Sequence, residues 1–250
     1  MKRTLGWMLV FGTVGISTAV HAKTQKFIGV DLNYAHSNNT KIDGITRVNP
    51  IPSTLPMHAR FGNSPQGKLS VGCRFSGFAG DTTLSHAPRL KLTVHHNQST
   101  TSSVVSETTG HMDAWMLSAG AKIYPLEALE IMQTPRYNPY VSLGMGAARA
   151  RMNMLTTTFR GFTETQGSFT HPGRNRTRFG WRIGGGLEMP VYGPDWLLNV
   201  GYEFQDFGKV EPLAGKYTRT SDNMVQDIGR VQGLDLKLHS FTLGVRYLFF

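Results

Sequence analysis

Eight segments of this chain alternate between apolar and polar or small residues. In the last of them, large apolar side chains stand at Phe241, Leu243, Val245, Tyr247 and Phe249. A period of two is that of a β-strand with one apolar and one polar face, so the chain is predicted to be all-β. The eight predicted strands are Phe27–Tyr34, Leu69–Phe75, Arg89–His95, Trp115–Ile123, Tyr140–Ala148, Phe179–Met189, Trp196–Gln205 and Phe241–Phe249.

The beginning of the chain has the composition of a secretory signal peptide. Lys2 and Arg3 precede an uncharged run to Val20, and Val20 and Ala22 are the small residues expected before a cut. We therefore expect a signal peptide over residues 1–22 and one domain over residues 23–250. That domain has no run of about 18 apolar residues, so it can cross a membrane only as a closed barrel with internally satisfied backbone groups.

Alternation alone also fits a soluble lipocalin-type barrel, in which the apolar face points inward. Three features favour the opposite arrangement. The polar faces are rich in glycine, which suits a narrow interior packed with long side chains. Aromatic residues gather near strand ends, and no central position of an apolar face carries a charge, which would cost about 2 to 4 kcal/mol in lipid. The predicted fold is an eight-stranded antiparallel up-and-down transmembrane β-barrel after a cleaved signal peptide.

The connections between the predicted strands differ at the two ends of the barrel. At one end they are mostly long and rich in Pro, Gly, Ser, Thr and Asn, as surface loops are. These predicted outer loops are Ala35–Gly67, Gln98–Gly110, Asn153–Thr177 and Gly208–Gly233. The predicted connections at the other end are Ser76–Pro88, Pro125–Asn138 and Pro190–Asp195, with one or two helical turns expected in Leu126–Met132.

The closing segment resembles the last strand of bacterial outer-membrane β-barrels. The resemblance implies that the barrel-assembly machinery reads a terminal pattern here, formed by Thr242, Gly244, Tyr247, Phe249 and Phe250. The segments FIGVDLNYA (27–35), PYVSLGMGAA (139–148), FGWRIGGGLEMPV (179–191), LLNVGYEFQDFG (197–208) and LHSFTLGVRYLF (238–249) resemble strands of the porin family that includes opacity-type surface antigens. The family likeness implies a bacterial outer-membrane location and a role as structural anchor, surface antigen or adhesin.

Charged residues on the polar faces are expected to lie inside the barrel. An eight-stranded barrel has an interior only wide enough for side chains, so opposite charges there should pair into a network that fills it. A polar track for ions, that is, a narrow pore, is the alternative interpretation. The predicted lumen network comprises Asp31, Arg74, Lys91, Lys122, Arg182, Glu188, Glu203 and Arg246.

The chain carries a net charge of +10, and its predicted outer loops have an excess of basic residues. Such a rim suits the phosphates of outer-membrane lipid and lipopolysaccharide. A sharper hypothesis is an adhesin for anionic host or envelope glycans, and a protein ligand also fits. A nucleic-acid partner is not expected behind a signal peptide. The predicted basic rim and loop residues are Arg149, Arg151, Arg160, Arg174, Arg176, Lys216 and Arg219.

His239 and Ser240 resemble the His and Ser of outer-membrane lipid A deacylases, which raises a lipid-modifying enzyme as an alternative. Adjacent strand residues point to opposite faces, whereas a nucleophile needs its base within about 3 Å. The apolar phase shifts between Leu238 and Phe241, which suggests a bulge able to bring the two together. Our expectation is that the chain has no catalytic residues, no metal site and no cofactor, and that its single Cys73 forms no internal disulfide.

Overall fold

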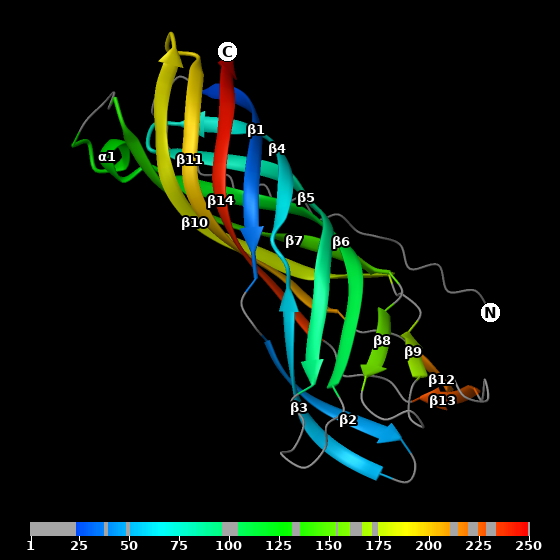
Figure 1. Ribbon diagram of the computed structural model, residues 1–250. Helices are drawn as coiled ribbons and strands as arrows, with labels where there is room; N and C mark the ends of the chain where they lie inside the picture. Colours follow the sequence, from blue (N-terminus) through cyan, green and yellow to red (C-terminus); the bar gives the residue numbers. More distant parts are fainter. Residues whose placement is uncertain are drawn as a thin grey trace, which may run out of the picture.

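The computed structural model consists almost entirely of β-strands (Figure 1). It describes residues 24–37, 40–48, 51–96, 105–131, 136–153, 155–160, 167–171, 175–210, 215–219, 225–228 and 234–249. The predicted signal peptide, residues 1–22, lies outside the described residues. In the described part of the chain, no helix is long and apolar enough to cross a membrane.

Eight strands close into a barrel in which every neighbouring pair is antiparallel. The last strand pairs with the first, from Lys26 opposite Phe249 to His36 opposite His239, and this pairing closes the ring. The predicted fold class is confirmed. In order around the barrel the strands are β1 (Gln25–His36), β4 (Ser64–Phe75), β5 (Phe78–His96), β6 (Val105–Ile123), β7 (Asn138–Met152), β10 (Asn175–Tyr192), β11 (Trp196–Val210) and β14 (Leu234–Phe249).

Six further strands continue the sheet beyond one end of the barrel, which we call the loop end (Figure 1). The four regions predicted as loops are therefore partly sheet, because β5 and β6 run on past the barrel and offer pairing edges to β3 and β8. The opposite end, the turn end, carries two short turns and the helix α1 (Pro125–Ala128). The strands added at the loop end are β2 (Thr40–Val48), β3 (Ile51–Phe61), β8 (Leu155–Arg160), β9 (Gly167–His171), β12 (Gly215–Arg219) and β13 (Val225–Ile228).

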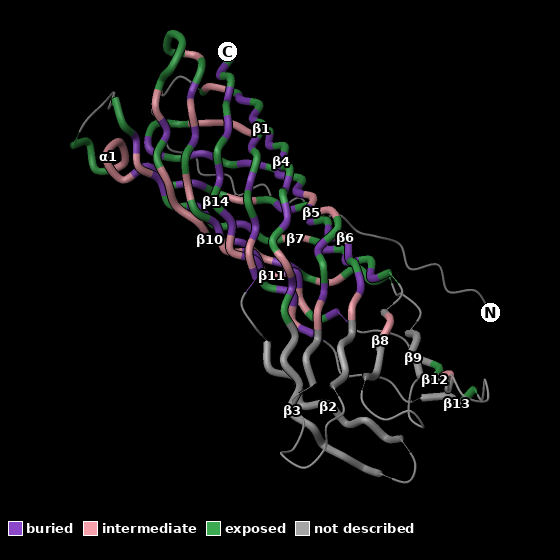
Figure 2. Tube along the Cα trace, in the orientation of Figure 1, coloured by how far each residue is buried: buried purple, intermediate pink, exposed green. Residues whose placement is uncertain are grey.

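The outer face of the barrel carries a band of apolar side chains next to the turn end. Their inward-pointing neighbours are buried, so buried and exposed residues alternate along each strand in Figure 2. Interfacial aromatic residues such as Trp115 and Trp196 flank the band. Members of the band include Ile28, Val30, Leu32, Leu69, Val71, Leu117, Val141, Leu143, Met145, Ile183, Leu187, Val200, Leu243 and Val245.

Beyond this band, toward the loop end, the two faces of the wall exchange character. In β14, Leu243 points outward, whereas Leu234, Leu236 and Leu238 point inward and are buried, and Lys237 between them is exposed. From His239 to Phe241, where the bulge was predicted, the pairing of β14 with both neighbours is continuous, so that prediction is wrong. The apolar phase shifts because the strand leaves the apolar band, and the apolar residues then serve an interior core.

The prediction for the third strand is also wrong in its bounds and its face. β5 begins at Phe78, within the segment predicted as a connection, and a bulge between Ala87 and Leu90 divides it. Arg89 adopts a positive φ of 50° at this bulge. Leu90 therefore points inward beyond the bulge and is fully buried, instead of facing outward.

The position of the band on β5 leads to a stability prediction. Leu84 points outward below the bulge, so Leu84→Arg should lower the free energy of unfolding by about 2 to 4 kcal/mol in lipid vesicles. Thr93→Arg, above the bulge on the same strand, should change it by less than about 0.5 kcal/mol, as surface substitutions do. Urea titration followed by tryptophan fluorescence measures both. Equal effects at the two positions would contradict this placement of the band.

Candidate functional site

Among the described residues, five cations and five carboxylates form ion pairs inside the barrel. Lys68 and Asp81 belong to this set although the sequence analysis missed them, and Glu127 joins it from α1. Lys91, predicted as a member, instead lies exposed on the outer face above the β5 bulge. The members are the cations Lys68, Arg74, Lys122, Arg182 and Arg246 and the carboxylates Asp31, Asp81, Glu127, Glu188 and Glu203.

Arg182 of β10 connects carboxylates from two other strands. Its Nη2 lies 2.5 Å from Asp81 Oδ1 of β5, and its Nη1 lies 3.1 Å from Glu203 Oε2 of β11. Its Nε donates to Ser118 Oγ of β6 at 3.0 Å. One guanidinium thus joins four strands across the lumen, which its fork of donors allows.

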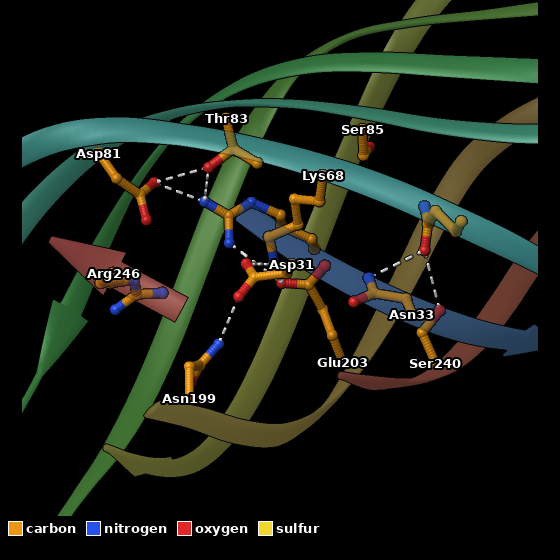
Figure 3. A network of polar contacts seen from close by, with 12 residues as sticks. Asp31, Asn33, Lys68, Asp81, Thr83, Ser85, Asn199, Glu203, Ser240 and Arg246 are labelled. Atoms are coloured by element: carbon orange, nitrogen blue, oxygen red, sulfur yellow. Dashed lines mark hydrogen bonds and ion pairs between the residues drawn. The ribbon is translucent and has the colours of Figure 1, made fainter. Parts of the chain in front are cut away.

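Lys68 of β4 provides the next link between the strands. Its Nζ lies 2.9 Å from Glu203 Oε2 and 3.8 Å from Asp31 Oδ2, as Figure 3 shows for these three side chains. Asn199 of β11 donates from Nδ2 to Asp31 Oδ1 at 2.9 Å. Glu203 is thereby shared between Lys68 and Arg182, so the contacts of these two cations form one ion-pair group.

Glu188 of β10 is the centre of a second ion-pair group near the turn end. Its carboxylate contacts Arg246 and lies 3.4 Å from Lys122 Nζ and 3.7 Å from Arg74 Nη1. The Tyr124 hydroxyl, beyond the end of β6, donates to Glu188 Oε2 at 3.0 Å. Burial raises the pKa of Tyr124 well above its ordinary value, so the hydroxyl keeps the proton that it donates.

Two glycines provide the space that Arg182 occupies. A Cβ on Gly120 would lie 2.6 Å from Arg182 Nη2, and a Cβ on Gly144 would lie 2.7 Å from Arg182 Nε. The glycine-rich polar faces of the sequence therefore do serve close interior packing at these positions. Side chains here would displace the guanidinium from its carboxylates.

The turn end of the lumen is closed by α1 and by aromatic residues. Glu127 of α1 accepts hydrogen bonds from Arg74 Nη2 at 2.6 Å, Asn138 Nδ2 at 2.7 Å and the Gly77 backbone N–H at 3.2 Å. These bonds join the helix to the β4–β5 turn and to the start of β7. Inside them lies the turn-end cluster, which consists of Phe27, Ala79, Tyr124, Tyr140, Leu197 and Leu248.

Toward the loop end, the charged network gives way to amides and then to an apolar core. Gln66 Nε2 donates to Gln205 Oε1 at 2.6 Å, and Gln66 Oε1 accepts from Asn33 and Ser240. Above this amide layer lies the loop-end core, which the sequence analysis did not predict because its residues share the alternation of the outer band. It comprises Ala35, Phe61, Ala87, Leu90, Leu92, Met112, Ala114, Met116, Ala148, Ala150, Met152, Phe207, Val210, Leu234, Leu236 and Leu238.

His239 and Ser240 do not form a catalytic pair. Ser240 points into the lumen, where it is fully buried and donates to Gln66 Oε1 at 3.2 Å. His239 lies on the outer face, where its Nδ1 contacts the Tyr202 hydroxyl. Because β14 has no bulge here, the strand holds the two side chains on opposite faces. Across the described residues, no three His, Cys, Asp or Glu side chains are grouped as a metal site.

The predicted rim residues Arg149, Arg151, Arg176 and Lys216 are exposed at the loop end. Arg174 and Phe250 lie outside the described residues, as do the side chains of Arg160 and Arg219. In the terminal pattern of β14, Thr242 and Gly244 face the lumen while Tyr247 and Phe249 face outward. The reading of this pattern by the assembly machinery stays a prediction.

Comparisons with known proteins place this architecture in context. A family model described as "Outer membrane protein beta-barrel domain" matches residues 8–249. Among solved structures, OprG from Pseudomonas aeruginosa aligns with a TM-score of 0.55 and 13% identity, covering 92% of this chain and 97% of that chain. Neisserial surface protein A aligns with a TM-score of 0.47 and 13% identity, covering 90% of this chain and 97% of that chain. A search of curated proteins found no match. At these identities the likeness to the solved structures concerns the fold alone.

The central position of Glu188 leads to a prediction for the folded barrel. Glu188→Gln removes the carboxylate shared by three cations, of which Lys122 and Arg246 are buried, and should lower the free energy of unfolding by about 3 to 5 kcal/mol. The matched control is Glu130→Gln, because Glu130 is exposed beyond α1. Urea unfolding in vesicles, read from heat-modifiable gel migration, compares the two variants. A Glu188→Gln barrel as stable as the control would show that the ion pairs do not hold the strands together.

Proposed function

Because the chain belongs to the outer membrane protein beta-barrel domain family, we propose that it is a sealed surface protein whose barrel anchors the strands of its loop end outside the cell. The chain is a protein of the bacterial outer membrane. The apolar band faces the lipid, and the short turns of the turn end lie in the periplasm. This arrangement leaves the loop end exposed as a structural surface element or antigen.

The filled lumen carries this proposal. Five cations and five carboxylates neutralise one another inside the barrel, and the loop-end core covers them on the outer side. Leu90, Leu92, Met112 and Met116 in that core have no exposed surface. An ion entering from outside would have to displace this apolar layer before it reached these ion pairs. These contacts favour an anchor over the narrow-pore alternative.

The partners that fit this role are the barrel-assembly machinery, which would insert the chain, and the outer-leaflet lipid with its lipopolysaccharide. A second candidate function is that of an adhesin for anionic glycans, favoured by the exposed Arg149 and Arg151 at the loop end. Their guanidinium groups can hold sulfate or phosphate through paired hydrogen bonds. The lipid-modifying enzyme is not part of the proposal, since His239 and Ser240 face opposite sides of the wall.

The sealed lumen leads to a conductance prediction. Purified chain in a planar bilayer should give no stable conductance, because side chains fill the interior of an eight-stranded barrel. Glu203→Gln should leave this result unchanged, although the residue lies near the middle of the network. A wide porin in the same bilayer serves as the positive control. Stable current steps whose size changes in the Glu203→Gln variant would favour the pore instead.

The adhesin hypothesis has a separate test. If the loop end recognises anionic glycans, the full chain in nanodiscs should bind a sulfated oligosaccharide, and the Arg149→Ser/Arg151→Ser variant should bind it about tenfold more weakly. Surface plasmon resonance measures the affinity, with the uncharged parent oligosaccharide as the control ligand. Unchanged binding after both substitutions would count against recognition through these arginines.

A further inference from the structure

Cations are unevenly distributed around the outer face of the barrel at the loop end. Among the described side chains of β5, β6 and β7 just above the apolar band, this face carries four permanent cations and one carboxylate, Asp113. His111 stands among them, directly across the strand pair from Lys91. We call this surface the basic patch, and its members are Arg89, Lys91, His111, Arg149 and Arg151.

The other side of the barrel has no such excess. On β11 and β14 the charges at the same level are matched across the strand pair. Asp206 stands opposite Lys237, and Lys209 stands opposite Asp235. The basic patch is therefore a local feature of β5 to β7 and not a general property of the rim.

The carboxylate beside the basic patch, Asp113, does not neutralise its neighbours. Asp113 Oδ1 accepts a hydrogen bond from the Arg89 backbone N–H at 2.9 Å, which holds the bulge of β5. Arg151 is its partner across the strands, yet within the described residues no ion pair reaches Arg89, Lys91, Arg149 or Arg151. Their charges are left available to an external anion.

The cationic side chains of the basic patch cannot turn into the barrel, because an apolar core fills its interior at this level. The residues next to them along the strands, such as Leu90, Met112 and Ala150, point inward and fill the loop-end core. Lys91 and Arg151 therefore point away from the barrel, and both are exposed. An anion that binds them must come from outside the barrel wall.

The position of the basic patch along the barrel axis, relative to the apolar band, indicates the source of that anion. Arg149 lies directly opposite Trp115 across the β6–β7 pair, and Trp115 stacks on His86 with ring centroids 3.6 Å apart. Exposed Trp marks the interfacial level of a membrane barrel. Arg151 follows two residues further from the band, about 7 Å along the strand. This span, just outside the hydrocarbon, is where the phosphate groups of lipid headgroups lie.

We propose that the basic patch is a binding site for the phosphate groups of a phosphorylated lipid in the outer leaflet, held against β5, β6 and β7. Lys91 and Arg151 supply the charge, with Arg149 fixed beside them by the 2.7 Å hydrogen bond from its Nε to Asn175 Oδ1. The barrel then has one preferred lipid-binding side. This inference rests on the membrane placement in the proposed function and adds a specific ligand class and location to it.

The test is native mass spectrometry of the full detergent-solubilised chain with bisphosphorylated lipid A and with its dephosphorylated form. The variant Lys91→Ser/Arg151→Ser removes two charges from the basic patch, and the matched control Lys209→Ser/Lys237→Ser removes two charges from the balanced side. Because each substitution removes a charge-assisted hydrogen bond to phosphate, the patch variant should bind bisphosphorylated lipid A at least about tenfold more weakly. The control variant should stay within about twofold of the native chain.

Three results would overturn the site. The first is that lipid A binding weakens equally in the patch variant and the control variant. The second is that the patch variant binds lipid A as tightly as the native chain. The third is that the native chain binds the dephosphorylated lipid as tightly as bisphosphorylated lipid A. A different result would assign the basic patch to a glycan instead. In that case a sulfated oligosaccharide competes with lipid A for the native chain, and the patch variant no longer binds the oligosaccharide but still binds lipid A. Heat-modifiable migration and the absence of conductance are measured on the same samples, so failure of the lipid site is distinguishable from failure of the sealed-barrel function.

Discussion

An eight-stranded barrel leaves room inside only for side chains, so each charge that enters the lumen needs a partner there. In this chain Glu188 and Arg182 meet that need from one strand, β10, by contacting groups on β4, β5, β6, β11 and β14. Gly120 and Gly144 are required because Arg182 occupies the space of their side chains. Neutralisation, strand registration and glycine placement are therefore consequences of the same narrow interior.

The second organising feature is the exchange of polarity along the wall. Within the lipid the outer face is apolar and the lumen is charged; beyond the lipid, Lys237 and Arg151 lie outside while Leu236 and Met152 are buried inside. Strands β5 and β6 have 19 residues each, well above the length of about 10 that crosses a bilayer. The additional residues enclose a core like that of a water-soluble protein. This core covers the interior ion pairs, and the wall around it carries exposed charged residues such as Lys237 and Arg151.

Much of the barrel was predictable because lipid imposes a strict period of two on its outer face, as in Leu143 of β7 and Leu243 of β14. The first half of β5 was missed because its outward residues include Gly80 and Thr82, which give a weak apolar signal, and Asp81 was missed with it. The change of apolar phase after Leu236 and Leu238 was interpreted as a β-bulge. The sequence alone does not show at which residue a strand passes from the lipid into water, where its apolar residues point inward. The partners of each interior charge depend on contacts across the lumen, which no local pattern encodes.

Spin labelling along β14 in the Cys73→Ser background offers the sharpest check that polarity reverses at the outer interface. The relaxation of a spin label at Leu243 should be accelerated by oxygen, which dissolves in the lipid. The relaxation of a label at Lys237 should be accelerated by a nickel chelate, which stays in the water. A label at Leu236 should respond to neither reagent, because its side chain lies in the loop-end core. If the label at Leu236 instead responds to oxygen as strongly as that at Leu243, the apolar face continues outward and the enclosed core does not exist.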